Sequence, residues 1–354
     1  MSHRGEREEN LDSTIAAFLI QDGVTNGAIY ALLGLALVLV FSVTRVIFIP
    51  QGEFVAYGAL TLALLDTGRV PGTAVLLICF GVAAFLLDLW GMRRGGGICA
   101  FLRSAAVNLV LPLAIYAIVL ALAPMQLGSI LKALLTIAII APMGVYLYRI
   151  AYRPLADASV LVLLIASVGV HLAMMGLGLI FFGAEGLRAR PLTSGSYSLG
   201  FLPFPAQSLW IYGCTIAIMA GLYLFFEKTL LGKALRATAV NRLGARLVGV
   251  RTRLTGGTAF LLAATIGAAS GVLIAPITTI YYDTGFLIGL KGFVAAIIGG
   301  LASFPVTAAA ALGVGMVESF ASFFASNFKE IIVFALIIPV LIWRSLATDP
   351  HEEG

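Results

Sequence analysis

An acidic residue inside an apolar segment is the first candidate for chemistry in this sequence. Glu53 follows Pro50-Gln51-Gly52 near the start of an apolar run over residues 48–65. An ionisable side chain at membrane depth is costly and usually faces the protein interior or a solute pathway. Proline and glycine favour a helix break at this point, and broken helices at membrane depth line cavities. We therefore expect Glu53 to lie in or beside a pathway, or else to partner a helix end or a nearby base.

Other polar groups extend this candidate pathway. Asn26 and Tyr30 lie one turn apart on the first apolar segment, Gly23–Thr44, and could offer hydrogen bonds to a solute. Hydrogen bonding between helices explains these two residues equally well. The full candidate set for the substrate pathway is Asn26, Tyr30, Gln51, Gly52, Glu53 and Tyr57.

Two further ionisable residues have simpler interpretations. Glu318 closes an apolar run behind Gly313 and Gly315, which is typical of an interfacial acid near Lys329. His171 stands alone in an apolar helix with no acid nearby in the sequence, which favours a packing role.

The most polar long stretch inside the hydrophobic body is residues 228–253. Its basic residues, with no acid among them, are Lys228, Lys233, Arg236, Arg242, Arg246, Arg251 and Arg253. Leu235, Ala239, Leu243 and Leu247 recur at intervals of four, which predicts a helix with one apolar stripe. Such a helix can lie on an anionic membrane surface or dock a soluble partner, and physics alone favours the surface.

The composition shows which solvent surrounds these groups. Hydrophobic residues make up 60% of the 354 residues and charged residues 11%, against about 25% charged in soluble domains. Lipid must therefore solvate most of the chain. The sequence predicts an all-α, polytopic membrane protein of about ten or eleven transmembrane or re-entrant helices, because lipid-exposed backbone must satisfy its own hydrogen bonds.

The organisation is that of one membrane domain. We expect a short polar N-terminal segment over residues 1–22, a transmembrane domain over 23–344 and a polar tail over 345–354. Basic residues near Arg93, Arg149 and the 228–253 stretch fall on one side when helices are counted, which the positive-inside rule makes cytoplasmic. The pairs Gly23/Gly27, Gly267/Gly271 and Gly285/Gly289 predict close helix packing.

The basic stretch also resembles the cytoplasmic loop of ATP-binding-cassette importer permeases. That loop carries Glu-Ala-Ala, three residues and Gly; here Leu243, Gly244, Ala245 and Gly249 stand at those positions, so the Glu and the first Ala are replaced. GKALRATAVNRLGARLVGV is similar to the branched-chain amino acid permease family, as are YRPLADAS (152–159), residues 24–61 and residues 289–319. The family often has Asn and His where Phe48 and Gln51 stand here. Residues 70–128 look like an extra helix pair.

The resemblance implies a permease subunit that carries branched-chain or related amino acids inward across a bacterial inner membrane. It implies ATP-binding-cassette subunits, a second related permease and a periplasmic or extracellular substrate-binding protein as partners. Residues 228–253 would be the coupling loop to the ATPase, with the candidate residues Arg236, Asn241, Arg242, Ala245, Arg246 and Gly249.

Other functional classes stay open on the residues alone. An ion-coupled secondary transporter needs membrane carboxylates, of which Glu53 is one. A permease for urea or short amides, or a structural or sensory membrane subunit with a lipid-binding loop, are further alternatives. No G-x-x-x-x-G-K-[ST] loop is present, so we expect no ATP hydrolysis by this chain. We also expect no enzymatic activity, cofactor, metal or nucleic acid.

Overall fold

The computed structural model describes residues 2–92, 97–125, 127–199 and 202–347. Among these residues, nine helices are long and apolar enough to cross a membrane, and they confirm the all-α, polytopic fold. They include α1 (Ser2–Thr44), α3 (Gly72–Met92), α6 (Ser129–Leu147), α7 (Val160–Phe182), α8 (Ala206–Lys228), α11 (Thr252–Ile274) and α13 (Phe304–Phe324). The other two spans are built from α4 (Ile98–Ala105), η1 (Ala106–Val110) and α5 (Leu111–Leu122), and from η3 (Ser326–Phe328), α14 (Lys329–Ala335) and α15 (Ile337–Ala347).

Two shorter helices complete the membrane body. α2 (Gln51–Asp66) and α12 (Thr284–Ile298) pack against longer helices of the body. Arg45, between α1 and α2, has a φ of 61°, so the chain turns sharply after α1.

Close helix contacts hold the core, as the glycine pairs predict. Gly23 and Gly27 on α1 lie against the backbone of α13, and Gly267 and Gly271 on α11 lie against α2. Gly285 and Gly289 on α12 both contact Gly52. Small residues let these backbones approach closely, which replaces the hydrophobic effect as a source of attraction in lipid.

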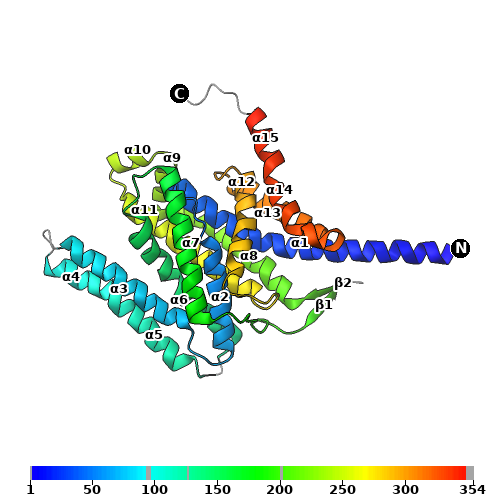
Figure 1. Cartoon of the computed structure of the whole chain (residues 1–354), viewed down its shortest axis with the longest axis horizontal. Coiled ribbons are helices and arrows are strands. Elements are labelled where there is room, and N and C mark those ends of the chain that lie inside the picture. The colour runs from blue at the N-terminus through cyan, green and yellow to red at the C-terminus, as the bar shows by residue number, and fades with distance from the viewer. Residues whose placement is uncertain (1, 93–96, 126, 200–201, 348–354) are drawn as a thin grey trace.

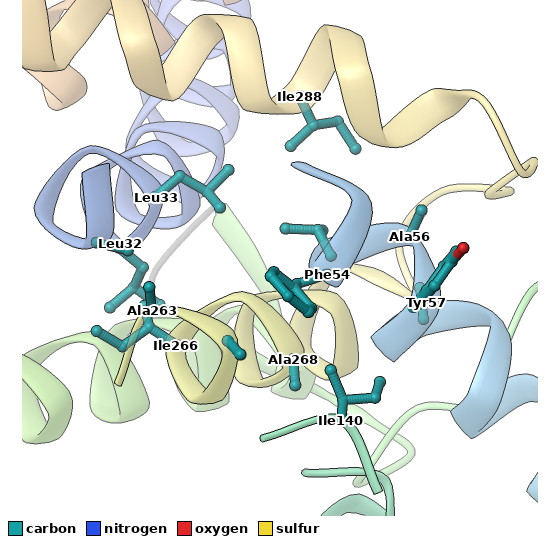
Figure 2. Close-up of a cluster of buried hydrophobic side chains, with 14 of the residues drawn as sticks. Leu32, Leu33, Phe54, Ala56, Tyr57, Ile140, Ala263, Ile266, Ala268 and Ile288 are labelled. Atoms are coloured by element: carbon teal, nitrogen blue, oxygen red, sulfur yellow. The ribbon is translucent and has the colours of Figure 1, made fainter. Parts of the chain in front are cut away.

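Aliphatic and aromatic side chains fill the space around these contacts. Figure 2 shows Leu32 and Leu33 on α1, Phe54 on α2 and Ile266 on α11 converging in one cluster. Ile288 approaches this cluster from α12. The core therefore centres on α2, which explains why the candidate residues on that helix are buried.

The remaining helices are more peripheral. In Figure 1 the pair formed by α3 and α4–α5 projects to the lower left of the body, while α15 extends away at the upper right. α8 and the last span expose most of their side chains, as expected for faces against lipid or another subunit.

Three local features complete the fold. α1 begins well before Gly23, where the first apolar segment was expected to start, so residues 2–22 are also helical. The segment between α7 and α8 contains a hairpin of β1 (Ser196–Leu199) and β2 (Leu202–Pro205), with Ser196 opposite Pro205. Residues 299–303 separate α12 from α13, and Pro305 occupies the first turn of α13, where proline is tolerated.

Candidate functional site

The first candidate site surrounds Glu53 on α2. Pro50 is the N-cap residue of α2, so Glu53 lies in the first turn, where the helix dipole stabilises a negative charge. Its side chain is fully buried. Glu53 Oε1 lies 3.0 Å from Nδ1 of His171 on α7, close enough for an ion pair although the two groups are not aligned as a directed hydrogen bond.

His171 therefore has a partner that the sequence did not reveal. The imidazole also stacks on Phe286 of α12, with ring centroids 4.6 Å apart. The ring contact fits the packing role expected for His171, and its acidic partner comes from a distant part of the sequence. Glu53 and His171 are far apart in the chain, and only the packing of α2 against α7 brings them together.

The other candidates on α2 have mixed roles. Gln51 donates through Nε2 to the Ala263 carbonyl at 2.9 Å, and its Oε1 is buried without a hydrogen-bond partner in the described structure. Gly52 forms a backbone contact with α12. The Tyr57 hydroxyl donates to the Met174 carbonyl at 2.5 Å. Among the α2 candidates, the buried polar atoms without a hydrogen-bond partner in the described structure belong to Gln51 and Glu53.

The two candidates on α1 do not join this cluster. Asn26 is half-buried, and among the described residues its side chain forms no hydrogen bond to α2. The Tyr30 hydroxyl instead donates to Glu318 Oε2 at 2.5 Å. Tyr30 therefore forms a hydrogen bond between α1 and α13. Such bonding between helices was the alternative to a role in the pathway.

Glu318 is a buried group in an ionic cluster, and the expectation of an interfacial acid near Lys329 was wrong. Lys291 on α12 donates to Glu318 Oε1 at 2.5 Å and lies 3.2 Å from Glu330 Oε1. The Lys291 and Glu318 side chains are only 7% and 9% exposed. Sequence reasoning missed Lys291, although a lone lysine inside an apolar run should have prompted a search for its partner.

The second candidate site is the basic stretch. It forms two helices, α9 (Leu230–Val240) and α10 (Arg242–Leu247), and not the single striped helix that the leucine spacing predicted. The break is at Asn241, whose backbone is extended and whose Oδ1 accepts from the Gly244 amide at 2.8 Å. Asn241 is thus the N-cap of α10, because its short side chain satisfies a free amide of the first turn.

The predicted loop arginines hold α10 in place. Arg242 donates to the Ala156 carbonyl at 2.7 Å, and Arg246 lies 3.3 Å from Asp157. Ala245 is the buried residue of α10 itself, whereas Arg236 on α9 pairs with Glu227 at the end of α8. The segment 152–159 is therefore the seat of α10.

The outer side of α10 is apolar and open. Leu243, Leu247 and Val248 are 68%, 81% and 79% exposed, and Gly249 has a φ of 88° with no atom near its Cβ position. In Figure 1, α9 and α10 lie at the upper left end of the body, on the side opposite the β1–β2 hairpin. An exposed apolar helix that basic side chains anchor is suited to docking another protein.

Comparisons with known proteins show which family the chain resembles. The family model for the branched-chain amino acid transport system permease component matches residues 96–341. The permease protein BraD of the high-affinity branched-chain amino acid transport system of Pseudomonas aeruginosa is 29% identical over 216 residues, which cover 59% of this chain and 70% of BraD.

A second relative gives the same picture. The permease protein LivH of the high-affinity branched-chain amino acid transport system of Escherichia coli K12 is 28% identical over 215 residues, which cover 58% of this chain and 69% of LivH. The family match includes α10, α11, α12 and α13. This chain belongs to the permease component family of branched-chain amino acid transport systems.

Proposed function

We propose that this chain is the membrane permease subunit of an ATP-binding-cassette importer that moves branched-chain amino acids inward across a bacterial inner membrane. The proposal rests on the exposed apolar face of α10, which lies within the segment that matches the permease family. The chain itself transports without catalysis. ATP hydrolysis belongs to separate ATP-binding-cassette subunits, and a second related permease and a substrate-binding protein complete the assembly.

α10 is the contact that couples this chain to an ATPase. Its seat on residues 152–159 transmits force to α6 and α7, because the segment joins those two helices directly. Coupling requires an element whose position both the ATPase and the solute site can bias. α10 meets this requirement at one end of the body. Its seat on residues 152–159 leads directly into α7, and His171 of the Glu53 cluster lies further along α7.

The Glu53 cluster marks the solute path. An amino acid carries an ammonium group, which the buried carboxylate of Glu53 can bind, and Gln51 Oε1 offers a further acceptor. The cluster is closed in this conformation, as alternating access requires of one of its states. Asn26, Tyr30, Gly52 and Tyr57 support the path by packing and hydrogen bonding, without a direct solute contact in this conformation.

Co-purification tests the docking surface. We expect the affinity-tagged chain, extracted in mild detergent, to retain ATP-binding-cassette subunits, and Leu247→Asp to lose them because the charge enters an apolar contact. Leu346→Asp is the matched control, because Leu346 is 82% exposed but lies beyond the last span. Retention of the ATPase by Leu247→Asp would remove α10 as the docking element.

Uptake tests the transport function. In proteoliposomes with all partner subunits, we expect labelled leucine to accumulate with ATP and without any ion gradient, and Glu53→Gln to lower uptake at least tenfold while the ATPase still co-purifies. Uptake by this chain alone, driven by an ion gradient, would instead establish the secondary-transporter alternative. Preference for urea over leucine would assign the amide permease.

A further inference from the structure

A cavity of about 1190 Å³ lies between the α3–α5 helix pair and the body of the protein. Four arginines line it, from three different parts of the chain: Arg103, Arg149 and Arg153, and Arg253. Each lies near the end of a candidate membrane span or just beyond it, on the side to which the basic loops belong. The cavity is therefore at the cytoplasmic boundary of the membrane.

The positive charge in this cavity is largely uncompensated. Arg149 lies 2.5 Å from Asp88 Oδ2 and donates to Asn108 Oδ1 at 2.6 Å, so it is neutralised and fixed. Over the described residues, no carboxylate forms an ion pair with Arg103, Arg153 or Arg253. Three cations that face a shared space at a membrane boundary favour an anionic ligand.

The walls of the cavity also carry apolar side chains, which a soluble anion would not contact favourably. Leu87, Leu254 and Val107 line the same space and are 42%, 53% and 46% exposed. A phosphate ion from the cytosol would gain nothing from these side chains, whereas acyl chains would cover them. The combination of cationic and apolar lining matches a phospholipid.

The backbone is also unusual at this place. Two π-helical turns, η1 and η2 (Tyr148–Tyr152), both contribute residues to the cavity lining. The first presents Asn108 and the second Arg149, which bond to each other across the gap. π-helical turns inside α-helices are often found at functional sites, because they redirect side chains that a regular helix would place elsewhere.

We propose that this cavity binds an anionic phospholipid, with its phosphate among Arg103, Arg153 and Arg253 and its acyl chains along Leu87 and Leu254. The bound lipid fastens the α3–α5 pair to α6 and α11. The site shares Arg153 with the segment that seats α10 but includes no residue of α10 or of the Glu53 cluster, and lipid binding can be measured without transport.

Lipid binding by the purified full chain tests the proposal. In delipidated protein in neutral detergent, we expect phosphatidylglycerol at a hundredfold excess over its Kd to raise the thermal midpoint by about 4 °C. Phosphatidylcholine and inorganic phosphate should leave the midpoint unchanged. An equal rise with inorganic phosphate alone would overturn the proposal in favour of a soluble-anion site.

Three variants locate the effect. Arg103→Gln/Arg253→Gln should raise at least tenfold the phosphatidylglycerol concentration that is needed to shift the thermal midpoint. Arg103→Lys/Arg253→Lys should respond at the same concentration as the parent. Gly257→Leu should also abolish it, because the added Cβ meets only Tyr148 Cδ1 at 3.8 Å and the rest of the side chain fills the cavity. Arg251→Gln is the control, since Arg251 is exposed but outside the cavity. A full response in both the glutamine double variant and Gly257→Leu would overturn the proposal.

Discussion

At the scale of single residues, the ionic cluster of Lys291 and Glu318 ties three helices together inside the membrane body. Breaking one partner of a buried ion pair costs about 3–5 kcal/mol, because the other charge stays buried without compensation. We therefore expect Lys291→Met to lower the thermal midpoint of the detergent-solubilised chain sharply. Lys291→Met/Glu318→Gln should recover more than half of the loss, because the glutamine still accepts from Tyr30.

Lys329→Met is the matched control for Lys291→Met. The Lys329 side chain is 42% exposed and lies 4.0 Å from Glu330, so losing this ion pair should lower the stability by less than about 1 kcal/mol. If the double variant were no more stable than Lys291→Met, the buried charge on Glu318 would not be the cause of the loss.

The same residues show how far sequence reasoning reaches. The cost of a charge at membrane depth singled out Glu53, which is buried, because that argument needs only the residue type and its apolar neighbours. Its partner His171 and the pairing of Lys291 with Glu318 were missed, since each pair joins separate helices. Such pairs depend on which helix faces lie together, and one sequence does not contain that information.

At the scale of elements, the contact between α2 and α12 depends on Gly52. A Cβ at this position would overlap the Gly285 carbonyl oxygen, and backbone atoms on both sides leave no room for relaxation. We expect Gly52→Ala to destabilise the chain by at least about 1–3 kcal/mol, the usual cost of overpacking, measured as a lower thermal midpoint and lower yield.

Gly313→Ala makes the same change where space is free. No atom lies within 4 Å of the Cβ position of Gly313 on α13, and alanine is the better helix former. Its thermal midpoint should be unchanged or higher. Equal losses in the two variants would mean that the helices do not approach each other at Gly52.

The division between α9 and α10 leads to a prediction about coupling. Asn241→Ala removes the N-cap of α10, which typically costs about 1 kcal/mol, and should loosen α10 without unfolding the membrane body. We expect weaker co-purification of ATP-binding-cassette subunits at an unchanged thermal midpoint. Asn241→Asp preserves the acceptor and should behave like the parent; if it were as defective as Asn241→Ala, capping would not explain the effect.

The break at Asn241 also explains why the leucine stripe misled the sequence prediction. Leu235 is fully buried against the membrane body, whereas Leu243 and Leu247 are exposed on α10. Spacing of four residues predicts a shared face only while one helix continues. The Asn-Arg boundary is a local capping signal, and the regular spacing of the leucines concealed it.

At the scale of the whole molecule, the hydropathy pattern was sufficient for the fold class, because lipid imposes helices on every apolar segment long enough to cross it. The arrangement of those helices was not predictable in the same way. α2 is the most enclosed helix of the body although it is one of the shorter ones, and its glycine contacts come from α11 and α12, far along the chain. The length and hydropathy of a segment do not predict which helices pack against it.

The orientation of the whole molecule is the last quantity to test, since both the docking face of α10 and the lipid cavity require the basic ends to be cytoplasmic. In a background with Cys79, Cys99 and Cys214 replaced by alanine, we expect a membrane-impermeant maleimide to label Tyr197→Cys in intact cells. Leu247→Cys should react only after permeabilisation. Both positions are well exposed, at 58% and 81%, so access to the side chain does not limit labelling. The reverse pattern would place α10 outside the cell, where no ATPase could reach it.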